Sequence, residues 1–219
     1  MKSERVLMRI GIVGTGAVGR TLGTIWARAG HEVAFGSRDL ARAAEAAMGL
    51  AGARATTQEQ AAAFGEVVLW TPRGVMPADP DLLAGKIVLD PNNRGPGLSG
   101  SYASPRPEGP SLAEQLQAAA PQARVVKAFN TVVMRLLRED PERLHASGAQ
   151  VFLASDDAEA KAVAAALATE TGLGAVDLGG LEAAWMAEAM ADTFRQAMAT
   201  SPASWRQALV FADLADRPV

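Results

Sequence analysis

Residues 8–38, MRIGIVGTGAVGRTLGTIWARAGHEVAFGSR, decide how the rest of the chain is organised. Arg9 to Val13 is a short apolar run that predicts a buried strand. A glycine-rich turn follows directly, and apolar positions at helical spacing then run to Ala29. His31 to Phe35 predicts a second strand. Together these segments indicate a β-α-β unit of about 30 residues.

The glycines of this turn predict a phosphate-binding site. Gly14 permits a tight turn off the strand, and Gly16 lets backbone N–H groups approach a pyrophosphate with no side chain between them. Gly19 allows the helix to lie close to the sheet. The N-terminus of that helix adds N–H donors and a partial positive charge. We therefore expect a dinucleotide to bind at Gly14, Thr15, Gly16, Ala17, Val18 and Gly19.

The end of the second strand indicates which dinucleotide binds. An NAD site has an acidic residue there, about 20 residues past the glycine fingerprint. This chain has Gly36-Ser37-Arg38 instead, and a hydroxyl with a guanidinium suits a 2′-phosphate. We therefore expect NADP as the cofactor. Asp39 leaves an alternative open, in which Arg38 pairs with that carboxylate at the start of a helix.

Length and composition are typical of one α/β domain, and we expect a single domain over residues 1–219. Hydrophobic residues make up 49% of the chain and aromatic residues 5%, which indicates alanine-rich helices packed on a sheet. The net charge of −3 favours neither a nucleic-acid nor an anionic-membrane partner. The absence of cysteine excludes disulfides and thiolate-held metals.

The first residues predict the location. Residues 1–5 are charged, and the apolar run after them is broken by Arg9 and by glycines. This pattern is neither that of a signal peptide nor that of a membrane span. We expect a cytoplasmic protein without a membrane partner.

Strands and helices alternate along the remaining chain, which predicts a doubly wound parallel sheet covered on both faces. The expected strands are 53–56, 66–71, 86–90, 123–128, 150–154 and 174–177. The expected helices are 40–48, 58–64, 111–120, 132–138, 156–169, 181–199 and 205–214.

The segment from Pro91 to Pro110 is different in kind. It holds four glycines and five prolines, so neither a helix nor a strand is expected. It leaves the carboxyl end of a parallel strand, where open α/β sheets bind ligands. It is therefore either a lid or wall of the ligand pocket, or a mobile insertion.

Seven stretches carry a resemblance to a known family. They are IGIVGTGAVGRTL (10–22), GHEVAFGSRD (30–39), VVLWTPRG (67–74), KIVLDPNN (86–93), ARVVKAFNT (123–131), SDDAEAK (155–161) and DLGGLEAA (177–184). On these motifs the chain resembles the F420-dependent NADP oxidoreductase family. The cytosolic domain of the six-transmembrane metalloreductases is a more distant relative.

The resemblance implies a Rossmann fold with a small C-terminal α/β extension. It implies that Thr15, Ser37 and Arg38 hold the 2′-phosphate, that Thr71, Pro72 and Arg73 border the cofactor, and that Ala128 to Asn130 lie beside the nicotinamide. The family's reductases pass hydride between NADP(H) and a deazaflavin, and they look like dimers. The resemblance therefore implies the same reaction and a homodimer here. Two stretches depart from its pattern: Asp90-Pro91-Asn92-Asn93 replaces D-A-T-N-P, and the tail after Leu181 differs.

Few residues offer acid–base chemistry, and we name no catalytic residue and no metal ligand. His31 and His145 are expected to be structural or on the surface. Lys127 is either a structural ammonium that reaches the surface or a substrate contact. Tyr102, the only tyrosine, lies in the glycine- and proline-rich segment.

Two further features are interpreted as structural. Asp156 and Asp157 are interpreted as a helix N-cap pair. The apolar positions from Leu181 to Phe194 follow helical spacing, which favours packing in the core or in a homodimer over a cofactor contact.

The leading hypothesis is an NADPH-dependent oxidoreductase that exchanges hydride with a flavin-like or deazaflavin (F420) acceptor. Such a transfer needs proximity and orientation more than a side-chain acid. A reductase of small carbonyl or imine compounds is the second hypothesis, with Lys127 or Tyr102 as proton donor. A non-catalytic NADP(H) sensor is the third.

Overall fold

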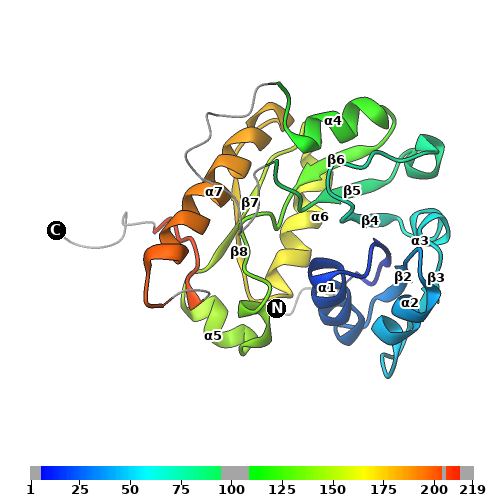
Figure 1. The fold of residues 1–219 in the computed structure, drawn as a ribbon, viewed down its shortest axis with the longest axis horizontal. Helices are drawn as coiled ribbons and strands as arrows, with labels where there is room; N and C mark the ends of the chain where they lie inside the picture. Colours follow the sequence, from blue (N-terminus) through cyan, green and yellow to red (C-terminus); the bar gives the residue numbers. More distant parts are fainter. Residues whose placement is uncertain (1–5, 95–108, 204–205, 213–219) are drawn as a thin grey trace.

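The computed structural model describes residues 6–94, 109–203 and 206–212. Six parallel strands form the central sheet in the order β3-β2-β1-β4-β5-β6, drawn in Figure 1. Their bounds are β1 Arg9–Val13, β2 Glu32–Gly36, β3 Ala53–Thr56, β4 Val67–Trp70, β5 Ile87–Asp90 and β6 Arg124–Lys127. This order defines a doubly wound Rossmann sheet, which confirms the predicted fold class.

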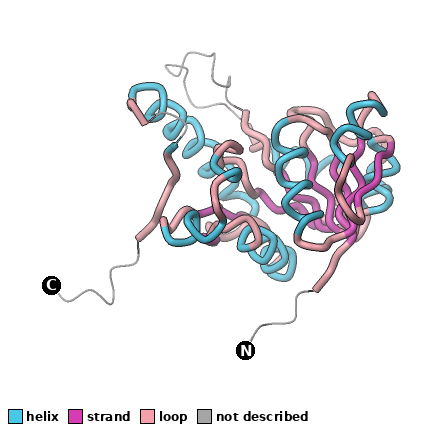
Figure 2. The backbone as a smooth tube through the Cα atoms, turned by 90° about the horizontal axis from the view of Figure 1, so that it is seen from below, coloured by secondary structure: helices cyan, strands magenta, loops and turns pink. Residues whose placement is uncertain are grey.

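Seven α-helices and three short 3₁₀ helices (η) lie in the described part of the chain, and helices flank the strands in Figure 2. The α-helices are α1 Ala17–Arg28, α2 Leu40–Ala47, α3 Gln58–Phe64, α4 Leu112–Ala119, α5 Pro141–Ala146, α6 Ala158–Thr169 and α7 Ala184–Thr200. The 3₁₀ helices are η1 Pro80–Leu83, η2 Leu136–Arg138 and η3 Leu181–Ala183.

Both faces of the central strands are buried, as the apolar runs predict. Val67 and Leu69 of β4 pack in the cluster that includes residues of α1 and α6, whereas Val68 and Trp70 pack in the cluster with residues of α3 and α4. Side chains alternate between the two faces of a strand, so an unbroken apolar run is stable only where helices cover both.

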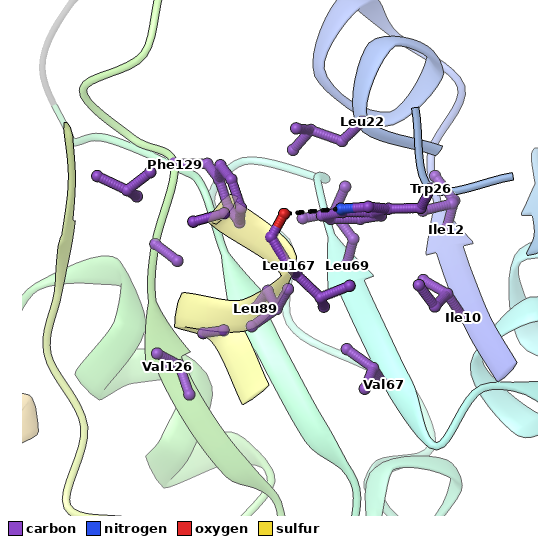
Figure 3. Packing of buried hydrophobic residues seen from close by; sticks show 14 of the residues in the cluster. Ile10, Ile12, Leu22, Trp26, Val67, Leu69, Leu89, Val126, Phe129 and Leu167 are labelled. Carbon is purple, nitrogen blue, oxygen red and sulfur yellow. Dashed lines mark hydrogen bonds between the residues drawn. The ribbon is translucent and has the colours of Figure 1, made fainter. Parts of the chain in front are cut away.

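Trp26 of α1 is a fully buried member of the larger cluster, and Figure 3 shows its indole beside Leu167. Its indole Nε1–H donates to the backbone oxygen of Leu167 in α6 at 3.1 Å. Its ring meets Phe129 edge-on, with 5.8 Å between the centroids. The glycine-rich helix is therefore held against both the sheet and the C-terminal part of the chain.

The C-terminal extension is a second, two-stranded parallel sheet of β7 Gln150–Leu153 and β8 Gly174–Asp177. A single antiparallel bridge between Lys127 and Ala154 joins it to the edge of the central sheet. Helix α7 packs beside β7, as Figure 1 shows. The predicted small α/β extension is confirmed.

Two expected helices differ in the structure. Only η2 forms within 132–138, because three consecutive β-branched residues, Thr131 to Val133, disfavour the first turn of a helix. Residues 207–212 of the expected 205–214 helix are not helical. They run beside β7, where Gln150 N–H donates to the Leu209 oxygen and the Phe211 ring packs on Phe152. The helices α5 and η1 were not predicted.

Candidate cofactor site

The glycine turn connects β1 to α1 and leaves an open space above the helix N-terminus. Gly14 has φ +98° and its N–H donates to the Gly36 oxygen at 2.9 Å, which fastens the turn to the end of β2. Gly16 is the N-cap residue of α1, with no side chain capping the helix. A Cβ atom added to Gly16 would meet nothing within 4 Å. This space suits an anion that accepts from the first N–H groups of the helix.

Thr71 locks the turn in place from β4. Its hydroxyl donates to the Val13 oxygen at 2.8 Å, and its backbone N–H donates to the same oxygen at 3.1 Å. A Cβ atom on Gly14 would lie 2.3 Å from the Thr71 hydroxyl oxygen. Gly14 is thus required both by its left-handed φ and by the close approach of Thr71.

A cleft of about 540 Å³ opens at the carboxyl ends of β1, β2 and β4. It is large enough for a substantial part of a nucleotide cofactor. The predicted site residues that line it are Gly14, Thr15, Gly16, Ser37, Arg38, Thr71, Pro72 and Arg73. Ala17, Val18, Gly19, Ala128 and Asn130 lie outside its lining. Sequence reasoning missed Arg42, Gln58, Glu59, Trp70 and the wall formed by residues 75–79 with Leu82 and Leu83.

The tip of β2 carries the groups expected to recognise a 2′-phosphate. Ser37 is nearly buried and its hydroxyl accepts from the Asp39 N–H at 3.2 Å. Asp39 is the N-cap of α2, with its Oδ1 accepting from the Ala41 N–H at 3.0 Å. The cation near Asp39 is Arg42, at 3.8 Å from its Oδ2.

Arg38 is therefore not the partner of Asp39, and the alternative of an Arg38–Asp39 pair is wrong. Across the described ranges no carboxylate lies within 4.0 Å of the Arg38 guanidinium, which is exposed and lines the cleft. The guanidinium is available to an anionic ligand.

Past the carboxyl ends of β5 and β6, polar side chains contact one another. Asn93 and Asn130 pair reciprocally: Asn130 Nδ2 donates to Asn93 Oδ1 at 2.8 Å, and Asn93 Nδ2 donates to the Asn130 backbone oxygen at 3.0 Å. Ala128 is fully buried. Phe129, between Ala128 and Asn130 in the sequence, has φ +61°, in the left-handed region that a bulky residue rarely adopts.

A network of four charged side chains, here called the buried quartet, lies beneath these asparagines. It consists of Asp90, Arg94, Lys127 and Glu188. The Lys127 ammonium donates to Asp90 Oδ2 at 2.6 Å, to the Asn92 backbone oxygen at 2.6 Å and to Glu188 Oε1 at 2.9 Å. Arg94 Nε donates to Glu188 Oε2 at 2.6 Å. Two cations and two carboxylates balance, which makes their burial tolerable.

Lys127 is fully buried and its ammonium is structural, as one of the two interpretations from the sequence expected, but the expectation that it reaches the surface is wrong, and so is the alternative of a substrate contact. Its ammonium neither reaches the surface nor is open to a substrate, because three oxygens already accept its three N–H bonds. Sequence reasoning missed Glu188 and Arg94. The available signal was a carboxylate within the apolar run of α7.

The remaining candidates are structural where they are described. His31 is fully buried, accepts from the Met8 N–H at Nδ1 and contacts Glu170 Oε2 through Nε2 at 2.9 Å, at the end of the sheet away from the cleft. Asp157 caps α6, as predicted, while Asp156 Oδ1 accepts from the Leu181 N–H. Tyr102 lies outside the described residues, as does most of the Pro91 to Pro110 segment.

Two absences hold for the described ranges only. No group of three His, Cys, Asp or Glu side chains there is arranged to hold a metal ion. No helix among those residues is long and apolar enough to span a bilayer.

The strand order, the open helix N-terminus and the cleft at the switch between β1 and β4 define a Rossmann-type dinucleotide-binding protein. Residues 9–94 match the family of NADP oxidoreductases described as coenzyme F420-dependent, which confirms the resemblance drawn from the motifs. The cofactor of that family is NADP, in agreement with the residues at the tip of β2.

Individual relatives extend the likeness beyond residue 94. A supposed F420-dependent NADP reductase from Arthrobacter sp. FB24 has TM-score 0.76 and 28% identity, over 94% of this chain and 100% of that one. The rat metalloreductase STEAP3 is 31% identical over 186 residues, which are 83% of this chain but 36% of the relative. This chain thus spans about a third of that protein. A reductive aminase from Aspergillus terreus, solved with NADPH and ethyl levulinate, has TM-score 0.56 and 18% identity, over 84% of this chain and 59% of that one.

Proposed function

We propose that this protein is an NADPH-dependent oxidoreductase that exchanges hydride with a flat, flavin-like or deazaflavin (F420) ring. The observation that carries the cofactor half is the cleft at the tip of β2, which Ser37 and Arg38 line, and in which no carboxylate of the described residues pairs with Arg38. The match of residues 9–94 to coenzyme F420-dependent NADP oxidoreductases supports the acceptor half.

The residues divide the proposed cofactor site into three parts. The turn from Gly14 to Gly19 binds the pyrophosphate, and Thr15, Ser37 and Arg38 bind the 2′-phosphate. Thr71, Pro72 and Arg73 border the adenosine half. Ala128 and Asn130 lie on the nicotinamide side, because the second half of a Rossmann sheet receives the second mononucleotide.

Hydride transfer between two stacked rings requires a dry, oriented site and no side-chain acid. This requirement is compatible with the described residues at the ends of β5 and β6, where Lys127 is fully buried and bonded within the protein. The carbonyl or imine reductase hypothesis is less favoured, because the N–H bonds of Lys127, one of its two proposed proton donors, are all occupied within the protein. The other proposed donor, Tyr102, lies outside the described residues. The likeness to reductive aminases at 18% identity concerns the fold alone.

The assembly and domain organisation remain part of this proposal. We propose that residues 1–219 form one domain with its extension, act in the cytoplasm and pair as a homodimer. Met186 on α7 is 47% exposed, and Ala189, Thr193 and Ala197 follow on the same face of the helix. Light scattering of the purified protein distinguishes a dimer from a monomer.

The acceptor is tested by stopped-flow oxidation of NADPH with F420, FMN, FAD, ferric chelates and a cyclic imine in turn. Ferric chelates are included because a metalloreductase is among the relatives. We expect saturable turnover with a flavin-like or deazaflavin ring. Tight NADPH binding with no turnover of any acceptor would instead support a non-catalytic sensor. Turnover of imines alone would contradict the proposed acceptor.

A further inference from the structure

The short turn that follows β4 carries an arginine at the cofactor cleft. The Val75 N–H donates to the Pro72 oxygen at 3.3 Å, and Gly74 between them has φ +68°. A positive φ at the third residue of a four-residue turn is the pattern of a type II turn, which favours glycine there. Arg73 is the second residue of this turn, is exposed and lines the cleft.

Both ends of this turn are bonded to the strands. Thr71, just before the turn, donates its hydroxyl to the Val13 oxygen at 2.8 Å. Trp70, the last residue of β4, donates its indole Nε1–H to the Val75 oxygen at 2.9 Å. The backbone of Arg73 therefore has a defined position at the carboxyl ends of β1 and β4.

The guanidinium of Arg73 is available to an anion. Within the described ranges, no side chain or backbone group forms an ion pair or a hydrogen bond with it. Two carboxylates line the same cleft, and both are used at helix starts. Asp79 Oδ1 accepts from the Asp81 N–H at 3.1 Å. The Glu59 carboxylate is bonded to its own backbone N–H and then to the Thr57 hydroxyl, and these bonds lower its pKa.

The glycine turn itself supplies neutral donors only. Residues 17–19, which begin α1, are alanine, valine and glycine. Arg20 is the first cation of the helix, and it is already paired, because its guanidinium donates to both carboxylate oxygens of Glu45 at 2.7 and 3.1 Å. A pyrophosphate at this turn would therefore meet N–H groups and the helix dipole but no cation of α1.

Cations line the cleft from two sides. Arg38 and Arg42 lie at the β2 side, whereas Arg73 follows β4, and β1 with its glycine turn lies between these strands. A Cβ atom added to Gly14 would lie 4.0 Å from Pro72 Cδ, so the turn that carries Arg73 begins beside the glycine turn. The two sides are thus placed for two different anions, one at the tip of β2 and one over the glycine turn.

We propose that Arg73 binds the pyrophosphate of the cofactor from the β4 side and supplies the cation that the glycine turn lacks. A guanidinium can donate two parallel N–H bonds to a phosphate group. Arg38 and Arg73 then recognise different phosphates of one ligand. This inference rests on the proposed use of NADP.

Three ligands that share the adenosine 2′-phosphate test this contact. NADP⁺ carries the pyrophosphate, adenosine 2′,5′-bisphosphate carries a single 5′-phosphate, and adenosine 2′-monophosphate carries none. Calorimetry measures the first two, and displacement of NADPH measures the third. Arg73→Ala should bind NADP⁺ about ten-fold or more weakly than wild type, the range of one charge-assisted hydrogen bond. Its affinity for the monophosphate should stay within about two-fold of wild type, with the bisphosphate in between.

Three further variants show whether the effect is specific. Arg38→Ala should weaken all three ligands, because each carries the 2′-phosphate. Arg73→Lys should lose less NADP⁺ affinity than Arg73→Ala, because it keeps the charge without the planar fork. Arg28→Ala, at the exposed far end of α1, should change none of the affinities. Since Arg73 is exposed, its variants should keep the wild-type Tm.

An unchanged NADP⁺ affinity in Arg73→Ala would overturn the inference. Equal losses for all three ligands would overturn it too, because Arg73 would then contact the adenine or the 2′-phosphate. A wild-type protein that binds none of the three ligands would contradict the proposed NADP site itself, which is a separate result.

Discussion

Cofactor choice is decided at the scale of single residues. Asp39, the carboxylate nearest the tip of β2, is used to cap α2, with its Oδ1 bound to the Ala41 N–H. The exposed Arg38 guanidinium beside it lines the cleft, and no carboxylate of the described residues pairs with it. In the proposed site a 2′-phosphate would supply an anion for this guanidinium, whereas the 2′-hydroxyl of NADH would not.

Arg38→Ala should accordingly weaken NADPH binding by about ten- to a hundred-fold, because charge-assisted hydrogen bonds contribute about 1.5–3 kcal/mol. NADH affinity should hardly change. Calorimetry with both cofactors measures the difference. Arg28→Ala, at the exposed far end of α1, is the matched control and should leave both affinities unaltered. Equal losses for NADPH and NADH would refute the assignment.

Two glycines of the turn should respond in opposite ways to the same substitution. Gly16→Val should fold normally, since its Cβ atom meets nothing within 4 Å, but should not bind NADPH because the side chain occupies the phosphate space. Gly19→Val should be destabilised by about 1–3 kcal/mol or more, because its Cβ atom would overlap the Gly14 oxygen. Thermal unfolding and calorimetry separate the two effects. Wild-type affinity in Gly16→Val would disprove the placement of the phosphates.

At the scale of elements, α6 is joined to the central sheet through its N-terminus. Asp157 caps the helix at the Ala160 N–H and binds Arg124 of β6, with 2.8 Å between Arg124 Nη2 and Asp157 Oδ1. The Arg124 guanidinium, and then the Ala160 N–H, hold the pKa of the Asp157 carboxyl well below its usual range.

This depressed pKa predicts how the stability contributed by Asp157 depends on pH. A carboxyl with a lowered folded-state pKa stabilises the protein above its unfolded pKa, near 3.8, and loses that contribution as the pH falls toward the folded value. Asp157→Asn should therefore lower Tm at pH 7, and the difference from wild type should narrow steadily below about pH 4. Calorimetric scans from pH 7 to pH 3 measure it. A difference that is constant over this range would show that the charge is irrelevant. Because both side chains are about a third exposed, we expect a modest effect.

At the scale of the whole molecule, the buried quartet joins parts of the chain that are far apart in sequence. Asp90 ends β5, Lys127 ends β6 and Glu188 belongs to α7, and Arg94 Nη1 also donates to the Gly109 oxygen at 2.8 Å. Asp90 and Lys127 are direct partners in the parallel register of β5 and β6. The quartet is thus where the extension is docked onto the ligand side of the sheet.

Removing one side chain of the buried quartet should lower the free energy of unfolding substantially. Lys127→Met should reduce the free energy of unfolding by about 3–5 kcal/mol, because Asp90 and Glu188 would remain buried with one cation fewer. Arg54→Met breaks a pair with Glu32 in which both side chains are more than half exposed, and it should cost less than about 1 kcal/mol. Urea denaturation of both variants gives the comparison. Similar losses would show that the quartet contributes no more than a surface pair.

The sequence by itself determined the N-terminal β-α-β unit, the parallel sheet, and the side of the cleft formed by the glycine turn with Ser37 and Arg38. These follow from local rules: apolar runs predict buried strands, glycines allow turns and close approach, and Ser37 with Arg38 stands one residue past the end of β2. Such features depend on residues close together in the chain, so no knowledge of tertiary contacts was needed. The capping box that Ser111 and Glu114 form at the start of α4 is equally local, since its two residues lie three positions apart.

Only the tertiary structure decided what α7 does. Lys127 and Glu188 lie 61 residues apart, and they meet because the bridge between Lys127 and Ala154 docks the extension against β6. The same docking draws residues 207–212 alongside β7 in place of the helix expected there. It also turns the Asn130 amide toward the Ala187 oxygen. A side chain's partner across such distances is set by how packed elements fit together, and hydrophobic periodicity carries no information about that fit.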